Sequence, residues 1–364
     1  MDGLQLRREF WFSFYRAGVM FVAMLSAGPL MAQVNSEPGV TLINRHAIMY
    51  SPATGKVYAV DKPHNAVWVI GADGSAKSVK VGSNPEDIAV NAWTGMAYVA
   101  NVESSTVSVL DGKTDAVVAT LRSPGQPYAI AADDLANKVY VTHSYSNLVT
   151  VIDGATNTAT GVKTGAADII AVDAAAKKVY LLGYESDTIR MLDTTSGEVT
   201  KIPSGTQHQW GIALGKTAGV LYVTHIRDKA LGAMDLKTHH VTRIPVGAIP
   251  SAVAVNDETD QVYVTNYDDG TVSVIDGKEG RVVATVKVGQ HPSAVAVDVK
   301  RNLVVVANTK DSTLSLIDGK TRRVWKTVKA GEHPYAIAID DKTQKVYVAN
   351  LAEKTFTAVA IGSR

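Results

Sequence analysis

After residue 40 the chain consists of short runs in which apolar residues dominate or alternate with polar ones, each bounded by Gly, Asn, Asp or Pro. Residues 251–289 are typical and read SAVAVN, QVYVTN, TVSVID and RVVATVKVG. Runs of this length and alternation predict β-strands. Since no stretch after residue 33 keeps the period of a helix, we expect an all-β fold.

A unit of four such runs repeats along the chain. The phrase around the second run recurs every 40 to 42 residues, at Tyr58, Tyr98, Tyr140, Tyr180, Tyr222, Tyr263, Val305 and Tyr347. Four-stranded repeats of about 40 to 45 residues are typical of a β-propeller, in which each repeat forms one blade. The first run alternates Ala with Val or Ile, which suits the innermost strand. We name the four strands of a blade a to d.

The eighth repeat has no fourth run, because the chain stops soon after TFTAVA at 355–360. Residues 40–43, VTLI, form an additional run before the first repeat. We therefore predict that this N-terminal strand completes the last blade and closes a single ring of eight four-stranded blades over residues 33–364.

The recurring phrases resemble those of a known family. YVTN, YVAN, the VIDGKT turn and the GxxPxAxAV crossover are similar to the motifs of the YVTN-repeat family of bacterial β-propellers. The resemblance covers nearly all of the chain after residue 40 and implies the propeller fold. It implies no single function, because members of one fold family can do different work.

The first 32 residues are different in composition. Arg7, Arg8 and Arg16 flank an aromatic stretch, residues 17–25 are apolar and uncharged, and Ala32 precedes Gln33 at a suitable cleavage position. This pattern predicts a secretory signal peptide over residues 1–32 and a periplasmic or secreted mature protein. An uncleaved membrane anchor is the alternative, although the uncharged run is short for a bilayer.

Composition limits the chemistry. With 36 basic and 35 acidic residues the net charge is +1, so no overall field favours nucleic acid as a partner. The chain has no cysteine, which excludes covalent c-type haem attachment, thiolate catalysis and iron–sulfur ligation. It also carries no nucleophile elbow, zinc-protease motif, P-loop or EF-hand. The absence of these motifs favours a non-catalytic binding protein, which we predict to be a monomer.

Topology gathers most of the histidines on one face. In an antiparallel meander the d-to-a crossovers and the b-to-c loops lie on the same face of the ring, here called the crossover face. Seven of the nine histidines map to it: His46, His64, His143, His208, His225, His291 and His333. The first positions of the inner strands add His46, Glu86, Tyr128, Asp168, Trp210, Ser251, Ser293 and Tyr335.

Two of the crossovers contain a His-Pro pair, in GQHPSAVAVD and GEHPYAIAID. Proline suits the entry to an inner strand, because it favours extended backbone before it and lacks an N–H. The histidine is replaced elsewhere by Asn84, Gln126, Ala166 and Ile249. We interpret this variation as the absence of a structural requirement at that position.

Three interpretations of this mouth of the channel remain open. It can be a hydrated funnel, or it can be a surface that binds a protein, a glycan or a small ligand through Tyr128, Trp210, Tyr335, Glu86, Asp168, His46 and His143. It can also hold a divalent transition metal through His208, His225, His291 and His333, or a tetrapyrrole. Propeller lactonases and lyases resemble the chain in placing a metal or a catalytic histidine at the channel mouth. The eight-bladed haem domain of cytochrome-type nitrite reductases resembles it in blade number. We predict binding without catalysis, with the metal- or tetrapyrrole-dependent protein as the alternative.

Overall fold

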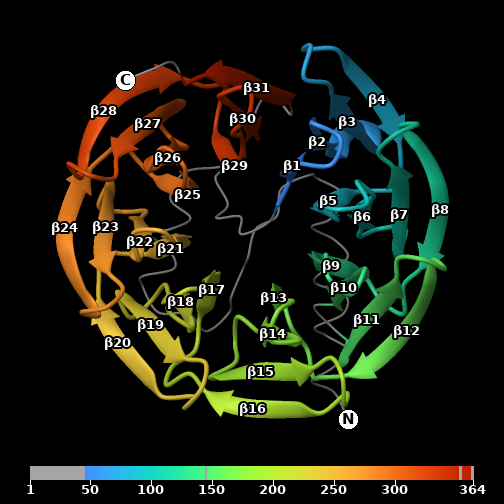
Figure 1. The fold of residues 1–364 in the computed structure, drawn as a ribbon, viewed down its shortest axis with the longest axis horizontal. Helices are drawn as coiled ribbons and strands as arrows, with labels where there is room; N and C mark the ends of the chain where they lie inside the picture. Colours follow the sequence, from blue (N-terminus) through green and yellow to red (C-terminus); the bar gives the residue numbers. More distant parts are fainter. Residues whose placement is uncertain (1–45, 144–145, 352–354, 362–364) are drawn as a thin grey trace, which may run out of the picture. The chain divides into compact units, whose positions relative to one another are not determined.

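The computed structural model describes residues 46–143, 146–351 and 355–361. These residues form eight antiparallel sheets arranged in a ring (Figure 1). Each sheet is one blade, and its strands follow the order of the chain from the centre of the ring to its rim. The predicted all-β, eight-bladed propeller is therefore confirmed.

The strand bounds follow the repeats read from the sequence. Blades 1 to 4 contain β1 (Ile48–Ser51), β2 (Lys56–Asp61), β3 (Ala66–Ile70) and β4 (Ala76–Lys80); β5 (Pro85–Val90), β6 (Ala97–Asn101), β7 (Thr106–Asp111) and β8 (Ala116–Arg122); β9 (Pro127–Asp133), β10 (Lys138–His143), β11 (Leu148–Asp153) and β12 (Thr158–Lys163); β13 (Ile169–Asp173), β14 (Lys178–Leu182), β15 (Thr188–Asp193) and β16 (Val199–Pro203). A single turn of 3₁₀ helix, η2 (Lys62–His64), lies between β2 and β3.

Blades 5 to 8 continue in the same way. They contain β17 (Gln209–Gly215), β18 (Val220–His225), β19 (Ala230–Asp235) and β20 (Val241–Pro245); β21 (Pro250–Asn256), β22 (Gln261–Asn266), β23 (Thr271–Asp276) and β24 (Arg281–Lys287); β25 (Pro292–Asp298), β26 (Leu303–Asn308), β27 (Thr313–Asp318) and β28 (Arg323–Lys329); β29 (Pro334–Asp340), β30 (Lys345–Asn350) and β31 (Thr355–Ala360). Five of the eight inner strands begin at a proline, as the sequence predicted.

The ring closes between blades 8 and 1. Strand β1 lies against β29 and β30, and the rings of Trp68 on β3 and Phe356 on β31 are 6.4 Å apart. Blade 8 has three strands among the described residues. Residues 40–43, predicted to supply the fourth, and the predicted signal peptide over residues 1–32 lie outside the described residues.

The core is a set of layers between neighbouring blades rather than one central mass. The b-strand tyrosine is at most 2% exposed in seven blades, and Val305 takes its place in blade 7. Tyr58, for example, packs with Val67 of its own blade and with Ile88 and Leu110 of blade 2. Because each blade buries its side chains only against its two neighbours, the ring can exceed the size at which a single core stops growing.

The Asp-Gly pairs between strands c and d form hairpins, but not the two-residue turns that this pair usually indicates. The loop after Asp153 is longer, and the Asp153 carboxylate accepts the N–H groups of Ala155 and Thr156 at 3.0 Å. A Cβ on Gly154 would lie 2.8 Å from the carbonyl oxygen of Asn137. The glycine is therefore required for close approach to the a-to-b turn of its own blade.

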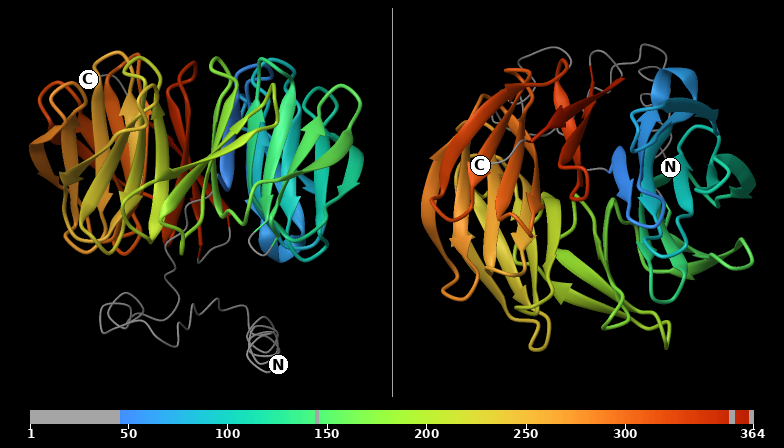
Figure 2. Two further views of the ribbon diagram at one scale, coloured as in Figure 1. Left: turned by 90° about the horizontal axis from the view of Figure 1, so that it is seen from below. Right: turned by 45° about the horizontal axis from the view of Figure 1, so that its top comes forward.

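Turns gather on two opposite faces of the ring, as the side view shows (Figure 2). One is the crossover face, and the other, here called the turn face, carries the a-to-b and c-to-d turns. In the part of the chain that the structure describes, no helix is long and apolar enough to cross a membrane.

Candidate functional site

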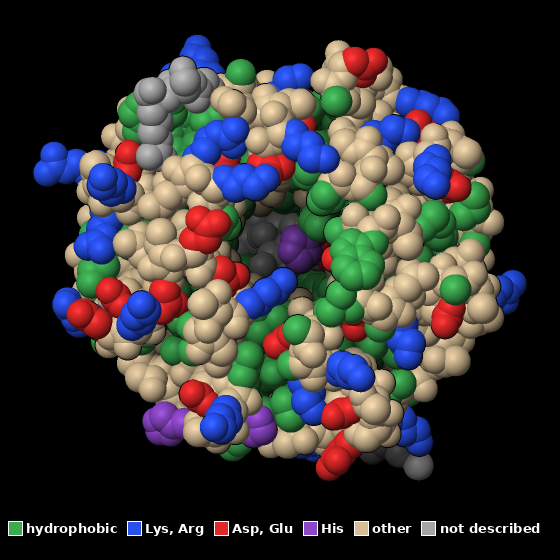
Figure 3. Space-filling model, in the orientation of Figure 1, with side chains coloured by type: hydrophobic (Ala, Val, Ile, Leu, Met, Phe, Trp, Pro, Cys, Tyr) green, Lys and Arg blue, Asp and Glu red, His purple; other side chains and the backbone are tan. Residues whose placement is uncertain are grey.

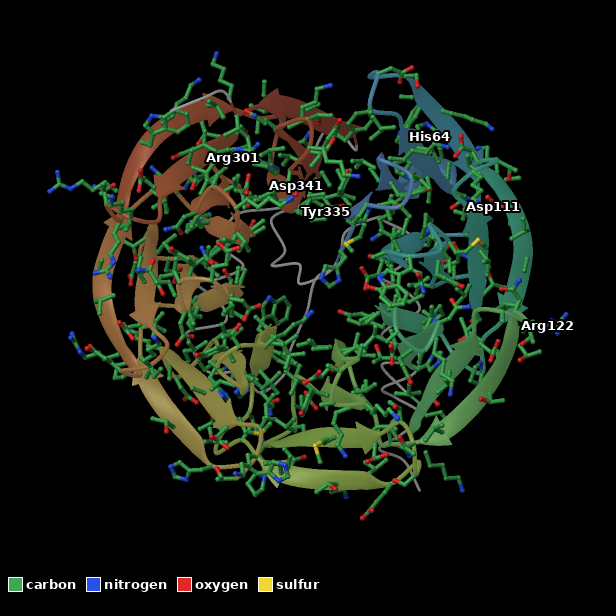
Figure 4. The ribbon with its side chains drawn as sticks, viewed as in Figure 1. His64, Asp111, Arg122, Arg301, Tyr335 and Asp341 are labelled. Carbon is green, nitrogen blue, oxygen red and sulfur yellow. The ribbon has the colours of Figure 1, made fainter. Side chains whose placement is uncertain are left out.

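The inner strands surround a central hollow (Figure 3). Their partly exposed residues are mainly small and apolar, as in Ala252–Val255 of blade 6. Tyr335 and Asp341, near the two ends of β29, lie close together in the view down the ring, because the strand runs along the channel (Figure 4). The wall is therefore apolar, and polar chemistry is concentrated at the two mouths.

In five blades the position before the inner strand does carry a backbone requirement, contrary to the interpretation above. His208, His291 and His333 have φ of 63°, 52° and 53°, and Asn84 and Ile249 share this left-handed backbone. Each of the five presents its carbonyl oxygen to an N–H of the b-to-c loop in the same blade, as His291 does to Thr309 at 3.0 Å. Polar side chains such as Asn and His are enriched at positive φ, whereas the β-branched Ile249 is an outlier.

His143 and His225 occupy the place of the final Asn in the YVTN phrase. In blade 6 the Asn266 amide donates to Thr271 and Ser273 at 2.9 Å, which ties strand b to strand c. His143 bonds Thr150 at 2.9 Å in the corresponding way. His225 faces Gly232, which leaves room for the larger ring, and its Nδ1 bonds the Thr206 hydroxyl at 2.8 Å.

Burial keeps both of these imidazoles neutral. Each is 1% exposed. Burial lowers the pKa of His225 to about 4, with a further contribution from the positive charge of Arg243, and burial also lowers the pKa of His143. Their hydrogen bonds and burial account for both residues as internal ties between strands.

A compact aromatic group lies at the crossover from blade 4 to blade 5. Tyr184, in the b-to-c loop of blade 4, makes edge-on contacts with the rings of His208 at 5.2 Å and Trp210 at 5.7 Å. Offset and edge-on ring contacts of this kind are favourable. Trp210 and His208 are both half-buried, so the group keeps exposed aromatic surface at the mouth.

Hydrogen bonds hold this group in place. The His208 N–H donates to the Tyr184 carbonyl at 2.7 Å, and the Tyr184 N–H donates to the Asp168 carboxylate at 3.0 Å. The buried Gln209 amide donates to the Ser186 carbonyl at 2.7 Å and to the Ser204 hydroxyl at 2.8 Å. The loop of blade 4 and the crossover to blade 5 are thereby joined into one rigid unit.

Arg227 adds a positive charge to the group. It follows strand β18 in the b-to-c loop of blade 5 and is half-buried. Burial raises the pKa of the Tyr184 hydroxyl, while the charge of Arg227 and a side-chain hydrogen bond from it lower that pKa. Burial and the same charge lower the pKa of His208, so its imidazole is mainly neutral at pH 7.

A related pair of rings lies at the crossover from blade 6 to blade 7. Tyr267 and His291 stack with centroids 4.4 Å apart and planes inclined by 17°. Tyr267 is 3% exposed and His291 is half-buried, so the tyrosine of the pair is packed into the protein. We name the two sets by their blades: the 4/5 group (Asp168, Tyr184, His208, Trp210 and Arg227) and the 6/7 group (Tyr267, His291 and Lys310, which holds in the b-to-c loop of blade 7 the position that Arg227 holds in blade 5).

The other predicted site residues are more dispersed. Glu86 is 9% exposed and pairs with Lys62, while the His46 N–H donates to the Asp87 carboxylate at 2.6 Å. Tyr335 is 9% exposed and Tyr128 is half-buried. Of the predicted binding residues, Asp168 and Trp210 are therefore brought together, each through Tyr184.

The four predicted metal ligands do not form a shared cluster. Within residues 46–143, 146–351 and 355–361, no three or more His, Asp or Glu side chains gather so that they could hold a metal ion. His208 and His291 instead lie against tyrosine rings.

Sequence reasoning missed Tyr184, Arg227 and Tyr267. All three lie just beyond the end of strand b, in the b-to-c loop that the topological argument had placed on the crossover face. For the two tyrosines the signal was available, because the residue after the last position of the YVTN phrase is Tyr in blades 4 and 6 and varies elsewhere.

Two features away from the crossover mouth are also notable. A hollow of about 390 Å³ lies between the outer strands of blades 2 and 3 and is lined by residues that include Arg122, Leu148 and Gly161. On the turn face Trp93 is 68% and Leu135 is 55% exposed, in adjacent turns joined by a 2.8 Å hydrogen bond from the Ala92 N–H to Asp134. Neither feature brings titratable side chains together.

Comparison with known proteins identifies the fold. No known family model and no curated protein sequence matches the chain, so the resemblance to YVTN repeats stays a prediction. Among solved structures, Kuenenia stuttgartiensis hydrazine synthase is 17% identical with a TM-score of 0.60, over 90% of this chain and 98% of that chain. Dihydro-heme d1 dehydrogenase NirN in complex with DHE is 12% identical with a TM-score of 0.70, over 87% of this chain and 75% of that chain. At these identities the likeness concerns the fold alone.

Proposed function

We propose that the protein is an exported, non-catalytic β-propeller that binds a small ligand at the crossover face, between blades 4 and 5. A protein or glycan that presents the same kind of chemical group would be bound in the same way. The observation that carries the proposal is the 4/5 group, in which the Tyr184 ring contacts the rings of both His208 and Trp210 beside the cation Arg227.

The chemistry of the group supports binding. Trp and Tyr offer large apolar area with few rotatable bonds, so they lose little entropy when a ligand packs against them. The hydrogen bonds of His208 and Gln209 to the loop of blade 4 fix the rings before a ligand arrives. A preorganised aromatic surface of this kind binds flat or partly aromatic molecules with little loss of conformational entropy.

The test compares the two faces of the ring with indole as an aromatic probe. Replacing Trp210 with Ala should weaken indole binding by about 2 kcal/mol, the scale of an interface hot spot. Lys237→Ala, in a c-to-d turn of the turn face, is the matched control and should leave affinity unchanged. Ligand-observed NMR titration measures both, and equal losses in the two variants would contradict the choice of face.

Export is the second part of the proposal and rests on the sequence of residues 1–32. The mature protein recovered from the periplasm or the medium should begin at or next to Gln33, as N-terminal sequencing would determine. Recovery of a chain that begins at Met1 in a membrane fraction would support an uncleaved anchor instead.

A tetrapyrrole is the second candidate ligand. NirN, which shares the fold, was solved in complex with DHE. In the present protein His208 and His291 both offer imidazoles at the crossover mouth of the channel. A titration with haemin, followed by its absorption spectrum, tests this alternative. A spectral change that disappears in His208→Ala would favour it over the general aromatic ligand.

A further inference from the structure

The two nitrogens on one edge of the Arg227 guanidinium stand out among the polar atoms at the crossover face. Nε and Nη2 are both shielded from solvent, and neither has a hydrogen-bond partner among the described residues. In Arg190 and Arg322, by comparison, only Nε is shielded from solvent without a hydrogen-bond partner. No ion pair between described residues includes Arg227.

The geometry of these two atoms specifies the missing partner. Nε and Nη2 point the same way from the planar guanidinium, and their spacing matches the two oxygens of a carboxylate in a bidentate contact. Leaving both donors unpaired while they are shielded costs free energy, because each has lost its hydration. A ligand carboxylate would restore both hydrogen bonds at once.

The acidic side chains close to Arg227 have other partners or are exposed. Asp228 pairs with Arg243 at 3.4 Å, and the Asp168 carboxylate accepts the Tyr184 N–H at 3.0 Å. Glu185 is exposed. The protein's own carboxylates therefore leave the Nε–Nη2 edge for an external anion.

The rings around Arg227 indicate the chemical character of the rest of the ligand. Tyr184 receives the side-chain hydrogen bond from Arg227 and also contacts Trp210 edge-on at 5.7 Å. A molecule that reaches the guanidinium therefore passes directly beside aromatic surface.

We infer that the ligand of the 4/5 group carries a carboxylate, which the Nε–Nη2 edge of Arg227 binds while an adjoining aromatic or other apolar part packs on Trp210 and Tyr184. This inference rests on the proposed function and names the class of ligand: a small aromatic or alicyclic carboxylate. Because the edge is shielded, the Arg227 side chain or a neighbour rotates as the carboxylate enters.

The test uses two compounds of the same shape. Indole-3-acetate carries the carboxylate, and indole-3-acetamide replaces it with an uncharged amide. Isothermal titration at pH 7.5 should show the acetate binding at least about tenfold more tightly than the amide, since charge-assisted bidentate hydrogen bonds are about twice as strong as neutral ones. In Arg227→Gln the two affinities should become equal to within about twofold, while Arg281→Gln, a remote exposed arginine, should keep the difference.

The outcomes separate this inference from the proposed function. If both compounds bind equally and Trp210→Ala weakens both, the carboxylate is overturned and the aromatic site stands. If neither compound binds, or if binding is insensitive to Trp210→Ala, both proposals are overturned.

A measurement without ligand gives an independent check. Replacing Arg227 with Met keeps the apolar stem and removes the two shielded donors that lack partners, so the melting temperature should rise by about 2 °C or more if the edge awaits a ligand. A fall in melting temperature would show that Arg227 is a structural residue and would overturn the inference.

Discussion

The 4/5 and 6/7 groups are built on equivalent backbone positions, but the first leaves aromatic surface exposed and the second buries its tyrosine. In each, an aromatic residue from the b-to-c loop of one blade contacts the histidine that precedes the inner strand of the next blade, and that next blade contributes a cation from its own b-to-c loop. The corresponding residues are Tyr184 with Tyr267, His208 with His291, and Arg227 with Lys310.

One inner-strand residue accounts for much of the difference. Blade 5 has Trp210 at its inner-strand entry, and Tyr184 meets that ring and His208 edge-on. Blade 7 has the small Ser293 there, whose hydroxyl bonds Thr309 at 2.5 Å, and Tyr267 and His291 stack face to face. The comparison teaches that one repeated crossover can be closed by stacking or left open as aromatic surface, depending on the side chain at one position.

The largest expected effect concerns the two tyrosines. Tyr267→Ala removes a ring that is 3% exposed, so it should lower the free energy of unfolding by about 3 to 5 kcal/mol, the range for deleting a buried aromatic side chain. Tyr184→Ala removes a half-buried ring and should cost less than about 2 kcal/mol, while weakening indole binding. Urea unfolding measures the two stabilities, and equal costs would remove the distinction between a packed and an open group.

The sequence predicted the ring, the strand order and the blade count, because the repeat is local and eight copies reinforce one another. It failed where a residue satisfies a backbone requirement that no side-chain pattern reveals. The left-handed position accepts Asn84, His291 and even Ile249, so the side chain varies while the backbone conformation is kept. The burial of His143 and His225 is hidden from the sequence for a related reason.

Topology places His143 and His225 on the crossover face with five other histidines, because it assigns a face but not a depth. Their burial depends on the hydroxyl of Thr150 and on the space above Gly232, which only the packed blades bring together. Likewise, the partnerless edge of Arg227 could not be inferred from the chain, because it depends on which acids already have partners.

The second expected effect is a loss of stability in acid. It comes from His225 of blade 5, and blades 6 and 7 have no histidine at the corresponding position. His225 has its pKa lowered from 6.5 to about 4 in the folded protein, so the unfolded chain takes up a proton first as the pH falls. The stability that the neutral ring contributes is present above pH 6.5 and is lost progressively down to about pH 4. At about 1.4 kcal/mol per pKa unit, the total loss is about 3 kcal/mol.

Blades 6 and 7 supply the matched replacement, because they carry Asn and Ser where blade 5 has His225 and Gly232. The double variant His225→Asn, Gly232→Ser should therefore flatten the decline in melting temperature between pH 6.5 and 4.5, as calorimetry would show. His239→Asn, on the turn face, is the control and should keep the wild-type decline. An unchanged pH profile in the double variant would contradict the assignment to His225.

The smallest effect tests whether each histidine matters to its group as a ring or as a backbone position. Asparagine tolerates the left-handed backbone, so His291→Asn keeps the backbone and removes the ring that stacks on Tyr267, which should cost about 1 kcal/mol of stability. His208→Asn removes an edge-on contact with a tyrosine that is already partly exposed, and it should cost about half as much or less. Valine at either position should cost a further 1 kcal/mol or so, because a β-branched residue is disfavoured at positive φ. Double-mutant cycles with the partner tyrosines isolate the ring contribution, and a larger coupling in the 4/5 group than in the 6/7 group would reverse the comparison.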